Sequence, residues 1–267
     1  MSTRFVPRGI ISRGRQSVVH RAWDSRTQRQ VAVKRVDADS GDALRHEARI
    51  LEAAANPHVV TFLDSGTDDD GAFLVMEPLD GETLEQFVAR APLDAADIEA
   101  VASQVLAALV ALHGRGIVHL DIKPENLMVS RKPGGTLDVK LIDFGAALEM
   151  VGGTFRHGDH EPVVGSLFFV APERFDRAPA DPRADLYSLG CVCYHAATGQ
   201  CPFQGDTAPQ VMVAHVRHVF TPLAVLRPDL PEHLRMWIER MFARDASARP
   251  ESAAAALEAL HDHRAVP

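Results

Sequence analysis

The chain is poor in cysteine, with three such residues in a sequence of 267. So few thiols, in an odd number, provide no disulfide framework and cannot supply a four-cysteine zinc site. We therefore interpret Cys191, Cys193 and Cys201 as small side chains in the core of a helix, an environment in which free cysteine is common.

Runs of basic residues and long apolar runs are also missing. The formal net charge is −8 and the pI is about 5.9, so we expect no nucleic-acid partner and no anionic membrane surface. No continuous run of about 18 apolar residues is present, and residues 1–8 contain no apolar signal core. These absences predict a chain without a membrane span and with a cytoplasmic location.

Lysine is scarce as well. Lys34, Lys123, Lys132 and Lys140 are the only lysines, and the other basic residues apart from histidine are arginines. An Arg-rich, Ala-rich chain is typical of a GC-rich genome, which favours a bacterial source. With 46% hydrophobic and 24% charged residues, the chain can bury a substantial core as one large domain or as two small lobes.

The pattern of apolar residues changes near residue 80. Before it, short apolar segments predict strands at residues 5–12, 18–24, 31–36 and 73–76, with a turn at 25–28. One helix interrupts these strands. It is predicted from Asp42 to the pair Asn56-Pro57, where proline would break the helical pattern.

After residue 80 the predicted segments become helical. Apolar residues recur at three- and four-residue spacing from Ile98 to Leu112, Asp94 can cap the start, and Gly114 and Gly116 can close the end. Further helices are predicted at residues 185–198, 208–219, 231–242 and 252–261. The predicted fold class is α+β, with a strand-rich first lobe and a mostly helical second lobe joined near residues 77–81.

The most informative segment is the run HLDIKPEN at residues 119–126, which is followed by DFG at 143–145. It brings Asp121, Lys123, Asn126 and Asp143 into one short region of sequence. A carboxylate can receive a hydroxyl proton, an ammonium can contact a γ-phosphate, and an amide with a carboxylate can hold magnesium. These are the groups that ATP-dependent phosphoryl transfer requires.

The two runs resemble the catalytic loop and the metal-binding loop of eukaryotic-like (Hanks-type) serine/threonine protein kinases. The resemblance covers about residues 5 to 260 and implies a bilobal protein-kinase-like fold. An antiparallel sheet and one helix would form the N-lobe (about 1–76), followed by a hinge (about 77–81) and a mostly helical C-lobe (about 82–267).

The resemblance also assigns roles within the catalytic loop. Asp121 would be the base or the hydroxyl-orienting group, and Lys123 would contact the γ-phosphate of ATP. Asn126 and Asp143 would hold Mg²⁺, with Mn²⁺ as an alternative ion. A lysine two residues after Asp121 resembles the serine/threonine branch of the family.

In the first lobe, the resemblance implies a phosphate-binding loop and an ion pair. Ser12, Gly14 and Ser17 stand at the three glycine positions of the kinase glycine-rich loop, where small residues let backbone amides approach phosphate. Lys34 ends the apolar run VAVK and is expected to pair with Glu47, which its helix phasing places on or beside the buried face. A solvated lysine at a strand end is the alternative.

Adenine would bind at the hinge segment MEPL, residues 76–79. The implied contacts are the backbone of Glu77 and Leu79, the gatekeeper Met76, and the apolar Val19, Ala32 and Met128 on the two faces of the purine. Taken singly, each apolar residue would be interpreted as core. Their register with Lys34 and Asp121 favours the nucleotide site.

Three later motifs follow in the order found in protein kinases: APE at 171–173, DLYSLG at 185–190 and the pair Arg249-Pro250. The resemblance implies an ion pair between Glu173 and Arg249, and a cap on the catalytic-loop backbone from Asp185. Ser166 would bond the catalytic Asp121. These groups would build a platform for docking a peptide, which favours a protein substrate over a metabolite.

Leu120 departs from the family pattern, because most members carry arginine there. That arginine binds an activation-loop phosphate and orders the loop, which leucine cannot do. Between Gly145 and Glu173 the only hydroxyl residues are Thr154 and Ser166. We predict activity that does not depend on phosphorylation of this segment. Its His157, Asp159, His160 and Glu161 fit a solvated loop better than a metal or pH-sensing cluster.

The first functional hypothesis is therefore an ATP- and Mg²⁺-dependent kinase that phosphorylates serine or threonine in protein substrates. Two alternatives stay open. Ser12 and Leu120 leave room for a pseudokinase or scaffold that binds nucleotide and partners, and a kinase for a small-molecule hydroxyl is the third hypothesis. Neither the substrate nor the oligomeric state is predicted.

Overall fold

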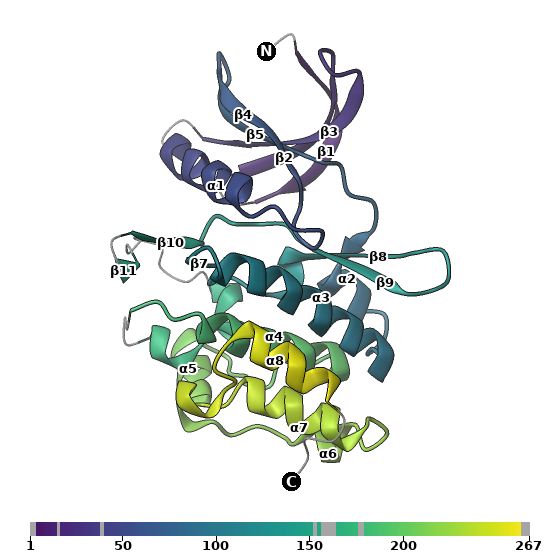
Figure 1. Ribbon diagram of the computed structural model, residues 1–267, viewed down its shortest axis with the longest axis vertical. Coiled ribbons are helices and arrows are strands. Elements are labelled where there is room, and N and C mark those ends of the chain that lie inside the picture. Colours follow the sequence, from purple (N-terminus) through teal and green to yellow (C-terminus); the bar gives the residue numbers. More distant parts are fainter. Residues whose placement is uncertain are drawn as a thin grey trace. The chain divides into compact units, whose positions relative to one another are not determined.

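The computed structural model describes residues 4–14, 17–37, 40–151, 154–155, 164–175 and 179–262, with backbone alone at 151, 154–155 and 164–166. The chain folds into two compact units, Met1–Asp80 and Gly81–Pro267. Figure 1 shows strands and one long helix in the first unit, and mainly helices in the second. This mixed content confirms the predicted α+β, protein-kinase-like fold, and the hinge at 77–81 stays a prediction.

The first unit is a five-stranded antiparallel sheet in the order β1-β2-β3-β5-β4. Its strands are β1 (Phe5–Arg13), β2 (Ser17–Asp24), β3 (Arg29–Val36), β4 (Phe62–Asp68) and β5 (Gly71–Met76). Helix α1 (Gly41–Ala53) lies against β4 and β5 (Figure 1). A core of Phe5, Ala22, Val31, Val33 and Val75 holds the sheet together.

Two sequence predictions for this unit were wrong. Strand β4 was not predicted, because its sequence FLDSGTD is mostly polar. It forms at the sheet edge by pairing along β5, where backbone hydrogen bonds do not require an apolar pattern. Helix α1 ends at Ala53, before the predicted break at Asn56-Pro57.

Helices build most of the second unit. They are α2 (Leu84–Val88), α3 (Ala95–His113), α4 (Arg183–Thr198), α5 (Ala208–Arg217), α6 (Leu223–Leu226), α7 (Glu232–Met241) and α8 (Ala253–His261). The Asp94 carboxylate accepts a hydrogen bond from the Asp97 amide at 2.9 Å, which confirms the predicted cap of α3.

Cys191 and Cys193 are buried in α4, as expected. Cys201 was predicted to lie in the helix core but instead follows the helix and is partly exposed.

Short strands and 3-10 turns connect these helices. The strands are β6 (Glu82–Thr83), β7 (Ile117–Val118), β8 (Leu127–Arg131), β9 (Leu137–Leu141), β10 (Leu148–Val151) and β11 (Thr154–Phe155). The turns are η2 (Pro124–Asn126), η3 (Val164–Phe169), η4 (Pro172–Arg174) and η5 (Ala246–Ala248). The predicted catalytic loop lies between β7 and β8, so strand pairing holds both of its ends.

Helix α3 is long and apolar enough to cross a membrane by length and composition, although the sequence alone predicted no such segment. In the structure it packs against α4, α8 and β9. Its buried side chains run from Ile98 to Leu112, and acidic Asp97 lies in its first turn. These contacts are those of a core helix.

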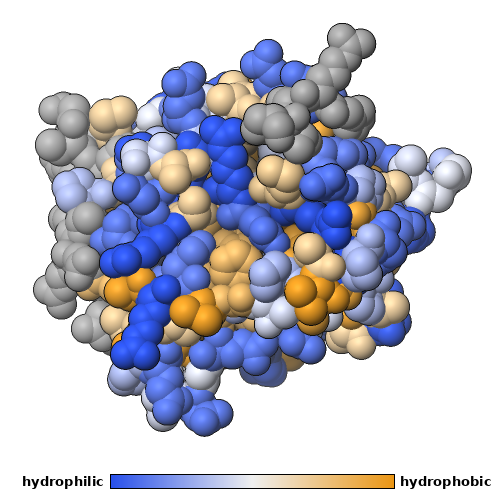
Figure 2. Space-filling model, turned by 90° about the horizontal axis from the view of Figure 1, so that it is seen from below, coloured by the Kyte–Doolittle hydropathy of each residue, from blue (hydrophilic) through white to orange (hydrophobic). Residues whose placement is uncertain are grey.

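On the face of the molecule in Figure 2, apolar residues gather in patches between hydrophilic ones.

Candidate active site

In the first unit, Lys34 on β3 and Glu47 on α1 form an ion pair. Lys34 Nζ donates to both carboxylate oxygens of Glu47, at 2.7 and 2.8 Å. The side chains are 12% and 4% exposed, so each charge would be costly to bury without the other. The pair that the sequence predicted is therefore formed, and it fastens α1 to the sheet.

The residues predicted to surround the nucleotide lie on neighbouring strands of this sheet. Val19 on β2 pairs with Lys34 on β3, and Ala32 pairs with Met76 on β5. Ala32 and Met76 are 7% and 6% exposed. Strand pairing thus joins the predicted apolar contacts to the lysine in one part of the sheet.

Of the three small residues predicted to approach phosphate, Ser12 lies near the end of β1, Ser17 begins β2, and Gly14 lies in the connection between the strands. Ser12 pairs with Val19, and the Gly14 amide donates to the Ser17 carbonyl at 2.8 Å. A Cβ at Gly14 would lie 3.0 Å from Ser17 Oγ, so a larger residue would crowd the turn. The turn between them, residues 15–16, lies outside the described part of the chain.

Glu77, the first residue after β5, is tied back to the first unit by Thr61. Its Oε1 accepts hydrogen bonds from the amide and the hydroxyl of Thr61, both at 2.7 Å. The Glu77 amide donates to the Thr61 carbonyl at 3.0 Å. These bonds fix the backbone that leads to Leu79. Sequence reasoning missed Thr61, because no motif marks it and its partner lies 16 residues away.

In the second unit, the catalytic loop brings two of the predicted groups, Lys123 and Asn126, to the carboxylate of a third, Asp121. Asp121 Oδ2 accepts hydrogen bonds from Lys123 Nζ at 2.7 Å and from Asn126 Nδ2 at 2.9 Å. Asn126 Nδ2 also donates to the Asp121 carbonyl at 2.8 Å. The Asn126 carbonyl accepts from the Ile142 amide at 3.1 Å, which links this loop to the residue before Asp143.

The donor set fits a magnesium ion. Because Asn126 Nδ2 donates to Asp121, the oxygen Oδ1 of the same amide is the atom left to face a cation. Asp143 supplies a carboxylate, and one of its oxygens accepts from the Gly145 amide at 3.2 Å. No cluster of three or more His, Cys, Asp or Glu ligands occurs among the described residues. An ion here would complete its shell with water and phosphate oxygens, as Mg²⁺ commonly does.

Asp185 holds the start of the catalytic loop. This buried carboxylate accepts hydrogen bonds from the amides of His119 at 2.9 Å and Leu120 at 2.7 Å. It also lies 2.9 Å from Nε2 of His113. Burial alone would raise the pKa of Asp185, but the hydrogen bond to His113 and the nearby His119 outweigh it and hold the pKa below its usual range.

Leu120 has a left-handed backbone, with φ of 63°. This conformation costs a non-glycine residue about 1–2 kcal/mol, and the bond from its amide to Asp185 offsets that cost. On its other side, the His119 ring is buried edge-on against Phe144, with ring centroids 4.8 Å apart. Burial lowers the pKa of His119. The sequence missed His113, although a polar residue ending an apolar helix is a signal that could have identified it.

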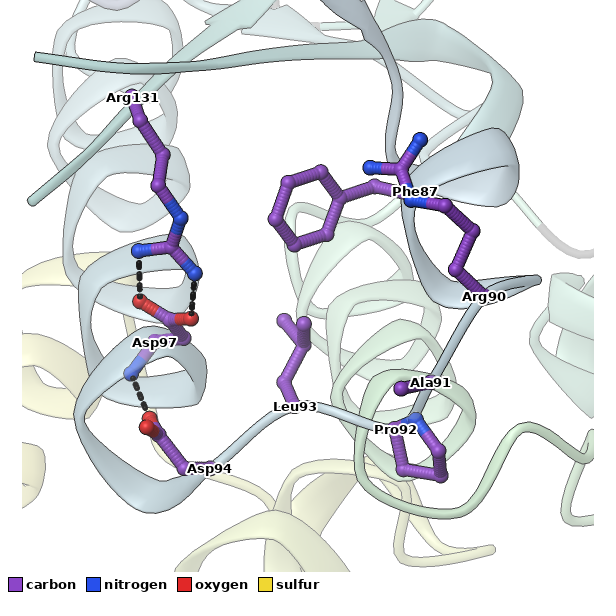
Figure 3. Close-up of a pocket in the computed structure, with 8 residues that line it drawn as sticks. All are labelled: Phe87, Arg90, Ala91, Pro92, Leu93, Asp94, Asp97 and Arg131. Carbon is purple, nitrogen blue, oxygen red and sulfur yellow. Dashed lines mark hydrogen bonds and ion pairs between the residues drawn. The ribbon is translucent and has the colours of Figure 1, made fainter. Parts of the chain in front are cut away.

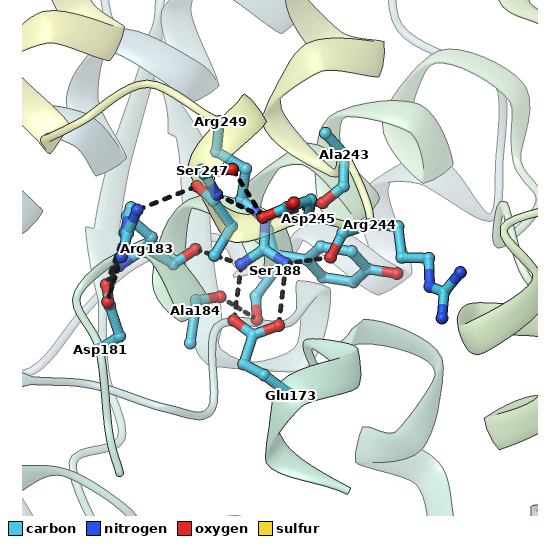
Figure 4. A network of polar contacts seen from close by, with 12 residues as sticks. Glu173, Asp181, Arg183, Ala184, Ser188, Ala243, Arg244, Asp245, Ser247 and Arg249 are labelled. Atoms are coloured by element: carbon cyan, nitrogen blue, oxygen red, sulfur yellow. Dashed lines mark hydrogen bonds and ion pairs between the residues drawn. The ribbon is translucent and has the colours of Figure 1, made fainter. Parts of the chain in front are cut away.

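Glu173 and Arg249 form the second predicted ion pair, shown in Figure 4. Arg249 Nη1 and Nη2 donate to the two Glu173 oxygens at 2.7 and 2.9 Å. The remaining donors of Arg249 reach the carbonyls of Ala243, Arg183 and Arg244. The arginine side chain is 0% exposed, so this pair is a fixed part of the second unit.

Other predicted residues are placed only in part. Met128 lies on β8, paired with Thr83 and Lys140, and is partly exposed. Ser166 lies in η3, but its side chain is outside the described atoms, so its predicted bond to Asp121 stays a prediction. The cluster His157, Asp159, His160 and Glu161 also lies outside the described residues.

Two pockets lie elsewhere. One, of about 340 Å³ in the second unit, is shown in Figure 3, where the Phe87 ring points into it between Arg90 and Arg131. Both guanidinium groups lie over that ring, at 5.0 and 5.5 Å from its centroid. The other, of about 430 Å³, lies in the first unit and includes Thr61 in its lining. No residue predicted for catalysis, nucleotide or metal lines either pocket, so chemistry and not pocket shape identifies the candidate site.

Comparison with known proteins bears on the same conclusion. Residues 5–263 match the family model described as protein kinase domain. The chain belongs to the protein kinase family. Its relatives include the "Probable serine/threonine-protein kinase PknB" of Bifidobacterium longum, 36% identical over 85% of this chain and 34% of that protein. PknL of Mycobacterium bovis is 32% identical over 100% of this chain and 68% of that protein. PrkC of Bacillus subtilis is 28% identical over 95% of this chain and 39% of that protein.

These comparisons confirm the predicted family and its serine/threonine branch among bacterial relatives. The chain spans about a third of the Bifidobacterium protein and about two thirds of PknL. Protein kinases in general use ATP and Mg²⁺.

Proposed function

We propose that this chain is a kinase domain that transfers the γ-phosphoryl group of ATP to serine or threonine hydroxyls of protein substrates. The observation that carries the proposal is the Asp121 carboxylate, which accepts from both Lys123 and Asn126 in a loop anchored on Asp185. Phosphoryl transfer depends on positioning and charge more than on covalent chemistry, so a rigidly held set of this kind suits it. The serine/threonine kinase names of the relatives support the substrate class.

In this proposal each group has one task. Asp121 orients the substrate hydroxyl and accepts its proton. Lys123 holds the γ-phosphate, and Lys34, kept in place by Glu47, holds the α- and β-phosphates. Asn126 Oδ1 and Asp143 would bind Mg²⁺, which when bound neutralises charge on the phosphates. The small residues Ser12, Gly14 and Ser17 would leave backbone amides accessible to phosphate.

The adenine would lie against Val19, Ala32 and Met128, and it would bond the backbone of Glu77 and Leu79. The two hydrogen bonds from Thr61 to the Glu77 side chain support this assignment, because they hold the start of that backbone in place. A cytoplasmic location, and the lack of a nucleic-acid partner, stay predictions from the sequence.

Transfer of labelled phosphate from ATP to a protein substrate tests the proposal. We expect Asp121→Asn and Asp143→Ala each to lose at least about a hundredfold in rate, because each removes positioning or metal binding. Asp206→Asn, which changes an exposed carboxylate of the second unit, is the matched control and should keep the wild-type rate. Equal labelling by wild type and both site variants would contradict the enzyme assignment.

The same assay separates the alternatives. A pseudokinase would show a thermal shift with ATP and magnesium but no labelling of protein. A metabolite kinase would consume ATP and label a small molecule while protein stays unlabelled. The ordered motifs APE, DLYSLG and Arg249-Pro250, with the Glu173–Arg249 pair formed, favour the protein kinase.

We also propose that activity does not require phosphorylation of the activation segment. The support is Leu120, whose apolar side chain offers no donor to a phosphate. Thr154→Ala should keep the wild-type rate within about twofold, whereas kinases that depend on a phosphate-binding arginine lose far more. A rate increase of about tenfold or more on phosphorylation of Thr154 would overturn this proposal.

A further inference from the structure

Thr61 and Glu77 meet at one end of the β4–β5 pair, within the first unit. The last paired residues of the two strands are Phe62 and Met76, and Thr61 and Glu77 are the next residues outward. The Glu77 amide donates to the Thr61 carbonyl at 3.0 Å, which continues the antiparallel pattern. Pro78 follows and has no N–H with which to extend it. The contact therefore lies where the segment proposed to bind adenine leaves the sheet.

The second half of this backbone pair differs from a regular sheet. In a hydrogen-bonded antiparallel pair, the amide of each residue donates to the carbonyl of the other. Here the Thr61 amide donates instead to Oε1 of the Glu77 side chain, at 2.7 Å. The Thr61 hydroxyl donates to the same oxygen, also at 2.7 Å. The carboxylate thus occupies the amide that would otherwise draw the Glu77 carbonyl toward β4.

These two bonds are strong for their position near the surface. A carboxylate oxygen that accepts from two donors forms charge-assisted hydrogen bonds, which are stronger than neutral ones. Thr61 is exposed and contributes to the lining of the pocket of about 430 Å³ in the first unit. Its side chain can therefore be changed without opening the core of the sheet.

The carbonyl of Glu77 is the acceptor in the backbone that the proposed function assigns to adenine. Adenine carries a 6-amino group, which donates, whereas guanine carries a 6-oxo group, which accepts. A carbonyl oxygen can bond the first, but it faces the second as one acceptor against another. Such a mismatch costs more than the lost bond, because both acceptors stay unpaired. The direction of this carbonyl therefore affects which purine nucleotide binds.

We propose that the contact between Thr61 and the Glu77 carboxylate determines nucleotide specificity. By holding the Thr61 amide and hydroxyl, the carboxylate directs the Glu77 carbonyl to the 6-amino group of adenine, so that ATP is selected over GTP. This inference rests on the proposed kinase function, which places adenine at this segment. Both side chains are positioning groups, which act on the nucleotide through the backbone carbonyl.

Steady-state kinetics of the full chain with one protein substrate, and with ATP or GTP, test this role. Glu77→Ala releases the Thr61 amide, which can then take the carbonyl of residue 77 as in a regular sheet. We expect the KM for ATP to rise about tenfold and the ATP:GTP ratio of kcat/KM to fall about tenfold, with the KM for the protein substrate unchanged. Glu77→Gln keeps a neutral acceptor and should change both values about threefold.

The threonine side of the contact is tested by Thr61→Val, which keeps the shape and the amide but removes the hydroxyl. Both values should change about threefold, and Thr61→Ser, which restores the hydroxyl, should recover most of the loss. Thr67→Val is the matched control. Thr67 is an exposed residue of the same strand that pairs with Ala72, so this variant should keep the wild-type KM for ATP and the wild-type ratio.

The outcomes separate this inference from the function beneath it. If wild type transfers phosphate from ATP while Glu77→Ala and Thr61→Val keep its ATP:GTP ratio, the specificity role is overturned and the kinase function stands, even if both variants melt at a lower temperature. Equal use of ATP and GTP by wild type also overturns it. If Glu77→Ala does not fold, Thr61→Val decides the matter. If wild type transfers no phosphate from ATP, the proposed function fails and the inference falls with it.

Discussion

Two ion pairs, one in each unit and each with one buried and one partly exposed side chain, join an acidic to a basic residue in different ways. In the first unit, Lys34 donates to both oxygens of Glu47 with a single ammonium on a flexible stem. In the second, Arg249 uses all three guanidinium nitrogens, on Glu173 and on backbone carbonyls. The arginine is locked by planar geometry, whereas the lysine can turn to another anion at modest cost.

The difference matches the proposed tasks of the two pairs. A group that must bind phosphate and release it benefits from a compact charge that can exchange partners. A group that supports a peptide platform benefits from being fixed. In the proposed function, the lysine pair therefore serves the chemistry, and the arginine pair serves the architecture.

The largest expected effect comes from breaking the Glu173–Arg249 pair. Arg249→Ala should lower the free energy of unfolding by about 3–5 kcal/mol, because it leaves the partly buried Glu173 carboxylate and several carbonyls without their fully buried guanidinium partner. Arg249→Lys keeps the charge but not the planar donors and should lose about 2 kcal/mol. Urea denaturation measures both. A loss by Arg249→Ala no larger than that of an exposed arginine such as Arg217 changed to alanine would remove the distinction between the pairs.

The second largest effect is expected from breaking the Lys34–Glu47 pair. Lys34→Ala should reduce the rate of phosphoryl transfer by about a hundredfold, equivalent to about 3 kcal/mol of barrier. Its loss of unfolding free energy should be smaller than that of Arg249→Ala, because Glu47 can take up a proton. Parallel kinetic and denaturation measurements check this. The comparison fails if Lys34→Ala costs stability alone and leaves the rate unchanged.

The smallest expected effect concerns the surroundings of the Glu173–Arg249 pair. The Arg249 guanidinium lies over the Tyr187 ring, and Tyr187 contacts the titratable side chain of His215. Its folded pKa of about 4 lies below the ordinary value of 6.5. Between these values the unfolded chain binds a proton that the folded chain does not, so stability falls as the pH falls from 6.5 toward 4. Relative to His215→Phe, wild type should lose about 1.5 kcal/mol between pH 6.5 and pH 5. If the free energy of unfolding of the two proteins changed equally with pH, the buried neutral state of His215 would be contradicted.

Local motifs carried much of the prediction. The sequence alone predicted the catalytic run, the lysine of β3 and the helix phase of Glu47. Each of these features depends on the spacing of residues within one short segment. The cap at Asp94 was predicted for the same reason. Strand β4 was missed, because an edge strand is recruited by its neighbour and needs no apolar pattern of its own.

Distant partners were predicted only where the family resemblance names both residues, as for Glu173 and Arg249, and three other pairs escaped prediction. Thr61 and Glu77 are 16 residues apart, Tyr187 and His215 are 28 apart, and His113 and Asp185 are 72 apart. Burial dictates that each polar group finds a partner, but not which one. The packing of distant segments against one another makes that choice.

By itself, the sequence of this protein determined the family, the order of the chemical groups and most helices, because motif spacing and amphipathic phase act over a few residues. The tertiary structure decided that Arg249 bonds backbone carbonyls as well as Glu173, and it placed His215 against Tyr187 in an aromatic cluster. Those outcomes depend on the cost of burying charge and unpaired donors, which is set only when distant segments exclude water together.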